Sequence, residues 1–343
     1  MPSTETILIT GANGYIGQHI VAHALSQGHN VRATARSESS LAKLRATFPQ
    51  HAAQLSTALV TDMTSPASYA SALDKTITAI IHTASPLVLD PKDLKADVLD
   101  PAINGSVAIL EAAVRYAPNA SRLVVTSSLA AVADPSAGLR PGYAYTSADW
   151  NPMTYEQAAA SSPVPAYVAS KALAERAMWD WVAAHKPPFT LTALNPSWVY
   201  GPVIGTPNLA SLNTSLAVLW SGLVDAQAVP PTDFPGFIDV RDLAAAHVNA
   251  LSRPAAAGQR LLASTRSSYQ TVADIVRDEF PELRGRVPEG RPGFGLTEDT
   301  YSVDGETAAR VLGIEYTPLR TTVKDTFAQL LAAEKAAKTV GTA

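Results

Sequence analysis

The sequence predicts an α/β fold in which a doubly wound parallel sheet is followed by a smaller C-terminal lobe. Short apolar runs alternate with longer helical patterns through the first 195 residues, as expected for repeated strand–helix units. The apolar runs are nearly continuous, which is typical of strands covered on both faces. After residue 195, proline and glycine become frequent. We therefore predict a sheet-bearing domain at residues 1–195 and a smaller, interleaved lobe at residues 196–343.

The predicted elements follow in order along the chain. The strand candidates are Ile7–Thr10, Val31–Ala35, Leu55–Val60, Ala79–Thr83, Leu123–Ser127 and Leu191–Asn195. The helix candidates are Tyr15–Gln27, Ser39–Phe48, Ser65–Leu73, Pro101–Tyr116, Tyr167–His185, Leu209–Leu223, Val240–Leu251 and Thr271–Glu279. Because ligands of such sheets bind beyond the carboxyl ends of the strands, the functional residues are expected at those ends.

Composition argues against several classes of function. A formal net charge of -4 without a long basic run disfavours a nucleic-acid partner. The chain has no cysteine, so disulfides, thiolate nucleophiles and zinc–cysteine sites are absent. His19 and His23 lack further ligands nearby, and no metal site is expected. Without a signal-peptide pattern or an apolar stretch of about 18 residues, we expect a cytoplasmic monomer or homodimer with no membrane partner.

The stretch "TGANGYIG" follows the first strand and opens the first helix, the context in which a glycine-rich motif indicates dinucleotide binding by a Rossmann-type sheet. Gly11 allows a tight turn, Gly14 exposes backbone N–H groups to a pyrophosphate, and Gly17 permits close helix–strand packing. The neighbours expected along the cofactor's phosphates and ribose are Asn13, Tyr15 and Ile16. An ordinary strand–helix turn is the alternative.

The second strand indicates which dinucleotide is bound. NAD-binding enzymes usually carry an acidic residue at its end, but no Asp or Glu occurs between Val31 and Ser37. Arg36 and Ser37 stand there instead, with Arg32 near the strand start, and a guanidinium suits a 2′-phosphate. We predict NADPH/NADP as the cofactor. For both arginines a solvated edge is the alternative, and for Arg32 it is as good an interpretation.

Two further strand ends fit the same ligand. Asp62 and Met63 are expected at the adenine edge. Thr83, Ala84 and Ser85 are expected beside the phosphate and the nicotinamide ribose. Either group is also compatible with an ordinary turn that has no role in binding, since Asp, Ser and Pro are common turn residues.

The stretch "YVASK" places Tyr167 and Lys171 on one face of a helix. A phenol is a poor acid or base near neutrality, and an adjacent ammonium favours the phenolate. A hydroxyl at the end of a neighbouring strand would stabilise the oxygen of a carbonyl that receives hydride, and "VVTSS" supplies Ser127 and Ser128. A surface Tyr–Lys pair explains most isolated matches, but this order of glycine loop, serines and Tyr–Lys pair is specific.

With these motifs the sequence resembles the extended short-chain dehydrogenase/reductases, and within them the group of yeast methylglyoxal and aldehyde reductases, plant dihydroflavonol reductases and cinnamoyl-CoA reductases. The matching stretches also include "VRATAR", "TASP", "LNPSWVYGP" and "FIDVRDLAAAHVNAL" and end near residue 251. The resemblance implies NADPH-dependent reduction of an aldehyde or ketone, with Ser128, Tyr167 and Lys171 as the catalytic set. The expected cofactor site also includes Ser127, Tyr167, Lys171, Pro196, Ser197 and Val199.

The expected substrate pocket is apolar and aromatic. Its wall is predicted from Leu87, Leu129, Tyr143, Trp198, Phe234 and Phe237, although such residues are more often simple core. Two other functions stay open: an NAD-retaining nucleotide-sugar epimerase or dehydratase, and a non-catalytic NADP-binding sensor. Arg36 disfavours the former, and the complete Ser–Tyr–Lys set disfavours the latter.

Overall fold

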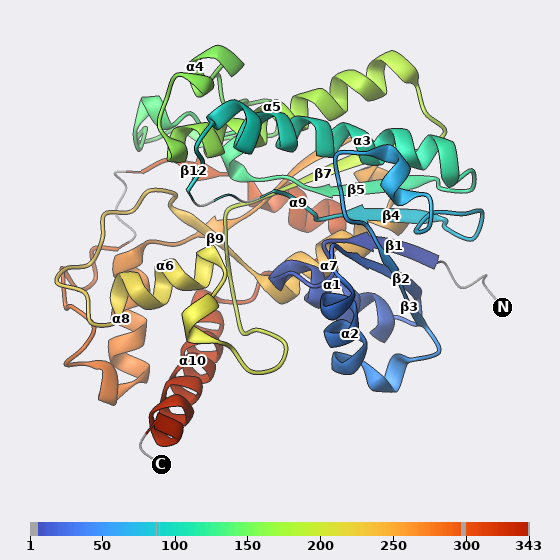
Figure 1. Cartoon of the computed structure of the whole chain (residues 1–343). Helices are drawn as coiled ribbons and strands as arrows, with labels where there is room; N and C mark the ends of the chain where they lie inside the picture. The colour runs from blue at the N-terminus through green and yellow to red at the C-terminus, as the bar shows by residue number, and fades with distance from the viewer. Residues whose placement is uncertain (1–5, 87, 89, 296–299, 342–343) are drawn as a thin grey trace.

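A seven-stranded parallel sheet forms the centre of the computed structural model, which describes residues 6–86, 88, 90–295 and 300–341 (Figure 1). The strand order is β10-β7-β5-β4-β1-β2-β3. The strands are Thr6–Thr10 (β1), Asn30–Ala35 (β2), Leu55–Leu59 (β3), Ala79–His82 (β4), Arg122–Thr126 (β5), Thr190–Pro196 (β7) and Arg260–Ala263 (β10). The order reverses between β1 and β4, which confirms the doubly wound α/β fold and gives the sheet a switch point for ligands.

Helices cover both faces of this sheet. One face carries α1 (Tyr15–Ser26), α2 (Glu38–Thr47), α7 (Val240–Ser252) and α9 (Gly305–Leu312), and the other carries α3 (Asp100–Tyr116) and α5 (Pro163–His185). Alternation along β1 explains the two layers: Ile7 and Ile9 pack with α1 and α7, whereas Leu8 packs with α3 and α5. The near-continuous apolar strands are therefore a consequence of burial on both faces.

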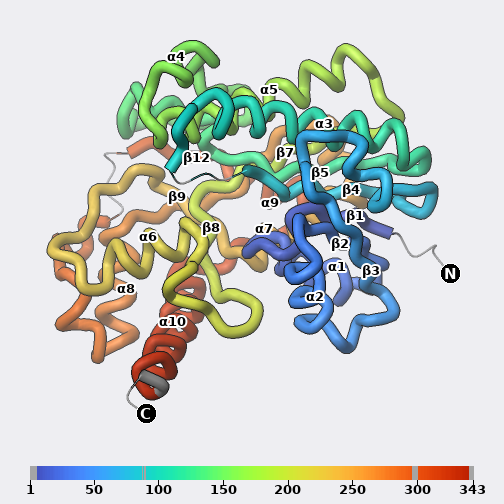
Figure 2. The backbone as a smooth tube through the Cα atoms, viewed as in Figure 1, coloured from blue at the N-terminus to red at the C-terminus, as the bar shows by residue number. Residues whose placement is uncertain are grey.

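The C-terminal part of the chain builds a second layer beside the sheet. A three-stranded sheet of β8 (Trp198–Tyr200), β9 (Gly236–Asp239) and β11 (Thr265–Arg266) lies with α6 (Thr214–Leu223), α8 (Tyr269–Glu279) and α10 (Leu319–Gly341) (Figure 2). Leu219, Val272 and Phe327 are among its buried residues. The short strands β6 (Ala144–Tyr145) and β12 (Ser302–Val303) pair with each other, and α4 (Tyr155–Ala159) precedes α5. The division into two units at residue 195 stays a prediction, because β10, α7 and α9 return to the central sheet.

Three predicted helices differ from the structure. The helix expected at Ser65–Leu73 is wrong, since only one 3₁₀ turn forms, at Pro66–Tyr69. The helix expected at Leu209–Leu223 is divided, because the Asn213 side chain accepts a hydrogen bond from the backbone N–H of Leu216 and starts α6 anew. Helix α5 begins at Pro163 rather than Tyr167, and proline is well suited to a first helical turn. Strand β10 was not predicted.

No helix in the described ranges is both long enough and apolar enough to cross a bilayer.

Candidate active site

The glycine loop joins β1 to α1 at the carboxyl edge of the sheet. Gly11 has φ +64°, and a Cβ there would lie 2.8 Å from the backbone nitrogen of Ala84. A Cβ at Gly17 would lie 2.2 Å from the carbonyl oxygen of Gly11. Conformation and space therefore both require glycine in this turn, as predicted. Asn13 and Gly14 are exposed beside the start of α1, where the first helical N–H groups, including those of Tyr15 and Ile16, lack intrahelical acceptors and suit an anion.

Two side chains of α1 connect this loop to the segment after β8. The Tyr15 hydroxyl donates to the carbonyl of Gly201 at 2.8 Å, and His19 Nε2 donates to the carbonyl of Pro202 at 2.9 Å. Burial lowers the pKa of His19, so its imidazole is neutral near pH 7. His19 thus has a structural role, and the described part of the chain contains no cluster of three metal-ligating side chains.

The two arginines of the second strand have different surroundings. Arg36, directly after β2, is exposed and makes no hydrogen bond or ion pair with the described residues. The Arg32 guanidinium instead binds the Asp74 carboxylate at 2.7 Å and the Ala72 carbonyl at 3.3 Å. Ser37 accepts a hydrogen bond from the Ser40 N–H and caps α2. The structure therefore leaves Arg36 available to a phosphate and does not support the prediction for Arg32.

The predicted adenine edge lies after β3. Asp62 is exposed and accepts hydrogen bonds from the backbone and the side chain of Thr64, which lower its pKa. Met63 is packed against α3, because a Cβ added at Gly105 would lie 2.7 Å from its methyl carbon. These contacts hold the turn in place and leave the Asp62 carboxylate ionised.

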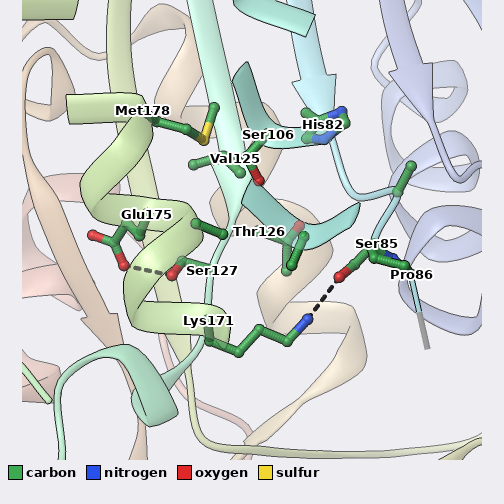
Figure 3. Close-up of a pocket in the computed structure, with 13 residues that line it drawn as sticks. His82, Ser85, Pro86, Ser106, Val125, Thr126, Ser127, Lys171, Glu175 and Met178 are labelled. Atoms are coloured by element: carbon green, nitrogen blue, oxygen red, sulfur yellow. Dashed lines mark hydrogen bonds between the residues drawn. The ribbon is translucent and has the colours of Figure 1, made fainter. Parts of the chain in front are cut away.

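Lys171 connects α5 to the loop after β4. Its Nζ donates to the Ser85 hydroxyl at 2.6 Å (Figure 3). The same Nζ lies 5.0 Å from the centre of the Tyr167 ring. Tyr167 is 39% exposed, which leaves its phenol open to a small molecule. Thr83 donates to the Thr10 carbonyl at 2.8 Å, so the loop that carries Ala84 and Ser85 is fixed to β1. The predicted Tyr–Lys pair and the predicted ribose loop therefore meet at one edge of the sheet.

The two serines after β5 have different partners. The Ser127 hydroxyl donates to the Glu175 carboxylate, as Figure 3 shows. The Ser128 hydroxyl accepts from the Ala130 N–H at 3.1 Å, and its own hydrogen has no acceptor among the described residues. A hydroxyl with a free hydrogen is what a carbonyl oxygen needs, so these contacts favour Ser128 over Ser127 as the donor to a ligand.

The predicted pocket wall is partly surface and partly core. Tyr143, Trp198 and Phe234 are half-buried, and the Trp198 and Phe234 rings meet edge to face at 6.4 Å. Leu129 and Phe237 are only 1% and 2% exposed and belong to packed clusters. This burial makes both of them core residues, a correction to the predicted wall. Leu87 lies outside the described residues.

The segment after β7 carries three further predicted cofactor contacts. Pro196 is the last, buried residue of β7, and Val199 is buried in β8. The Ser197 hydroxyl lies 2.8 Å from that of Ser264. The backbone here is thus tightly packed at the junction of the two sheets.

Two hollows adjoin these residues. A small cavity of about 30 Å³ lies behind Lys171 and is lined by His82, Ser85, Thr126 and Met178, among others. His82 is buried and bonded to the Thr10 hydroxyl at 2.8 Å, so it is part of the core. A wider groove of about 730 Å³ runs along α6 and includes Asp233, whose carboxylate accepts from Trp198 Nε1 at 3.0 Å. The groove therefore borders the aromatic wall.

Sequence reasoning missed three residues next to the serines: Glu175, Asn195 and Arg260. Glu175 is 2% exposed and forms an ion pair with Arg260 at 2.6 Å. Asn195 bonds both Glu175 and the Ser128 carbonyl. Of the three, only Glu175 had a sequence feature that pointed to the site: it follows Lys171 by four residues and so lies on the same face of the helix.

Comparisons with known proteins agree with this architecture. Residues 7–262 match the NAD dependent epimerase/dehydratase family. The chain is 35% identical over 337 residues to the NADPH-dependent methylglyoxal reductase GRE2 of Saccharomyces cerevisiae, covering 95% of this chain and 98% of that protein. It is 32% identical to the ketoreductase azaE of Aspergillus niger, over 95% and 98% of the two chains. The crystal structure of yeast methylglyoxal/isovaleraldehyde reductase Gre2 with NADPH superimposes with a TM-score of 0.91 at 35% identity, over 96% and 99% of the chains.

Proposed function

The chain belongs to the NAD dependent epimerase/dehydratase family, and we propose that within it the protein is an NADPH-dependent reductase of aldehydes or ketones. Its full-length relatives include proteins named as an NADPH-dependent methylglyoxal reductase and a ketoreductase. The observation that carries the proposal is the position of Lys171 Nζ, 2.6 Å from Ser85 Oγ and 5.0 Å from the Tyr167 ring centre. These two contacts support a role for one cation both at the proposed cofactor loop and beside the proposed proton donor.

The residues at the sheet edge fit NADPH. Gly11 and Gly17 let the loop pack tightly where a Cβ would clash with the backbone of Ala84 or of Gly11. Gly14 is exposed beside the backbone N–H groups at the start of α1, which suit a pyrophosphate. Arg36 offers the 2′-phosphate a guanidinium that has no partner among the described residues, and no Asp or Glu occurs between Val31 and Ser37. When bound, NADPH supplies the hydride.

Three side chains perform the remaining chemistry in this proposal. Tyr167 donates the proton of its hydroxyl to the carbonyl oxygen of the substrate as that oxygen gains charge. Ser128 donates a hydrogen bond to the same oxygen. Lys171 stabilises the phenolate that remains and retains two N–H donors, beyond the one used on Ser85, for the ribose. The half-buried rings of Tyr143, Trp198 and Phe234 favour an apolar or aryl substituent on the carbonyl.

Two other functions are less well supported. A nucleotide-sugar epimerase retains NAD, and the arginine after β2 suits NADP better. A dehydratase would place an acidic residue just after the serine, where this chain has Leu129 and Ala130. A sensor that only binds NADP has no use for Ser128, Tyr167 and Lys171 together.

One assay distinguishes these functions. NADPH absorbance is followed with aryl ketones, 2-oxo aldehydes and dihydroflavonols, and the products are identified by mass spectrometry. A reductase consumes one NADPH for each alcohol formed. Tight NADPH binding without consumption would identify a sensor, and conversion of a nucleotide sugar without net cofactor consumption would identify an epimerase. Light scattering of the same preparation distinguishes the monomer from the homodimer.

A further inference from the structure

One buried carboxylate lies directly behind the serine pair. Glu175, on α5, receives four hydrogen bonds, which fill the acceptor positions of a carboxylate. Its Oε1 accepts from Arg260 Nε at 2.6 Å and from Trp179 Nε1 at 3.1 Å. Its Oε2 accepts from Asn195 Nδ2 at 2.6 Å and from the Ser127 hydroxyl. The donors come from α5 itself, from the end of β5, and from β7 and β10.

Two of these bonds control the backbone of Ser128. Ser127, its preceding neighbour, is held through its side chain. Asn195 Nδ2 donates to Glu175 and also to the Ser128 carbonyl, at 3.1 Å. Glu175 accepts from the Ser127 hydroxyl (Figure 3), whereas the hydrogen of the adjacent Ser128 hydroxyl meets no acceptor within the described ranges.

The ion pair also extends to the aromatic wall. Arg260 Nη1 donates to the carbonyls of Ser147 and Asp149 at 2.6 and 2.7 Å. The Arg260 guanidinium carbon lies 3.5 Å from the centre of the Trp150 ring. Asp149 in turn accepts a hydrogen bond from the Tyr143 hydroxyl at 2.5 Å. The segment that carries Tyr143 is thus tied to the same carboxylate as the serine.

We propose that Glu175, through its ion pair with Arg260, is a positioning residue that orients Ser128 and the Tyr143 segment for carbonyl reduction. This inference rests on the proposed function and deepens it. A buried ion pair is weak evidence of a stabilising role, because well-packed apolar residues are often as stable. What distinguishes Glu175 is that two of its donors, Ser127 and Asn195, are joined directly to Ser128, the first by the chain and the second by a hydrogen bond to the Ser128 carbonyl.

The first test is Glu175→Gln, which keeps the shape of the side chain but replaces one acceptor oxygen with a donor. If the new amide faces Asn195, two donors oppose each other. Rotating the Asn195 amide would then set an oxygen against the Ser128 carbonyl. Since a displacement of about 1 Å can cost up to about 100-fold in rate, we expect kcat/KM for the carbonyl to fall by about tenfold or more. The Kd of NADPH should stay near the wild-type value, because Glu175 touches neither the glycine loop nor Arg36.

A double-mutant cycle separates positioning from general stabilisation. If Glu175 acts through Ser128, Glu175→Gln should lower kcat/KM far less in a Ser128→Ala background than in the wild type. Equal losses in both backgrounds would overturn the inference. Asp180→Asn is the matched control, because Asp180 is an exposed carboxylate on the same helix, and its activity should equal that of the wild type.

A second variant tests the inference in case Glu175→Gln does not fold, since that substitution leaves the largely buried Arg260 side chain without its carboxylate. Ser127→Ala removes one hydroxyl and keeps the ion pair. It should lower kcat/KM in the wild type and have little effect in Ser128→Ala. Full activity of both Ser127→Ala and folded Glu175→Gln would overturn this inference and leave the proposed function intact. Full activity of Ser128→Ala would overturn the proposed role of that serine, and this inference with it.

Discussion

Arg36 is predicted to decide which dinucleotide the protein prefers. NADPH differs from NADH only in the 2′-phosphate, and Arg36 is an exposed cation directly after β2, without a partner among the described residues. Arg36→Ala removes both the charge and the fork of donors while leaving the strand intact. We expect weaker binding of NADPH and nearly unchanged binding of NADH, because the lost contact exists for one cofactor only.

The magnitude follows from the exposure of the side chain. Two unit charges about 4 Å apart attract by about 4 kcal/mol at an effective dielectric constant of about 20. Solvent screening of an exposed group reduces this, and a hydrogen bond to a charged group is worth about 1.5–3 kcal/mol. We take the lower end of that range, about 1.5–2 kcal/mol, which corresponds to about a 10- to 30-fold change in affinity. Added salt should shrink the preference of the wild type and have little effect on that of the variant.

Initial rates with NADPH and with NADH, at a saturating carbonyl concentration, give the ratio of the two kcat/KM values. Arg32→Ala is the matched control, since Arg32 lies on the same strand but pairs with Asp74 at 2.7 Å. Its cofactor ratio should stay close to that of the wild type. An unchanged ratio in Arg36→Ala, or an equal shift in Arg32→Ala, would refute the assignment.

Three further predictions concern catalysis, the glycine loop and pH. Tyr167→Phe keeps the ring beside Lys171 but removes the donated proton, so kcat should fall by about 100-fold or more while the fluorescence-measured Kd of NADPH is unchanged; a near-normal kcat would contradict the role. Gly17→Ala should lower Tm and weaken NADPH binding, because its Cβ would lie 2.2 Å from the Gly11 carbonyl, whereas Gly222→Ala, in open space on α6, should be neutral or stabilising. Burial lowers the pKa of His82 and of His247 to about 4. The unfolded chain therefore binds protons that the folded one does not. As the pH is lowered from about 6.5 to 4, the free energy of unfolding should fall by about 1.4 kcal/mol per pH unit for each histidine. A urea midpoint that does not change from pH 7 to 5 would contradict this.

Local chemistry predicted the parts of the site whose geometry is set within one element or one turn. The glycines were predictable because the positive φ of Gly11, and the short contact that a Cβ at Gly17 would make with the Gly11 carbonyl, arise within the same strand–turn–helix unit. Tyr167 and Lys171 share a helix face by spacing alone. The helix expected at Ser65–Leu73 is wrong because the spacing of its residues does not reveal the local turn in which the Thr64 N–H donates to Asp62. After this turn, one 3₁₀ turn forms at Pro66–Tyr69.

The contacts that sequence reasoning missed all depend on pairings between distant segments. A glutamate four residues after Lys171 is, by itself, typical of a solvated helix face. It becomes a buried charge only because β10 pairs with β7 and brings Arg260 next to it, 85 residues away in the sequence. A contact between α5 and the end of β5 distinguishes two adjacent serines that are chemically identical in the sequence. Ser127 was expected to contact the cofactor, but its hydroxyl is bonded to Glu175, whereas the hydroxyl hydrogen of Ser128 has no acceptor in the described part of the chain. The role proposed for Ser128 therefore depends on tertiary contacts, and we expect it to depend on Glu175 rather than on the serines' own neighbours in the chain.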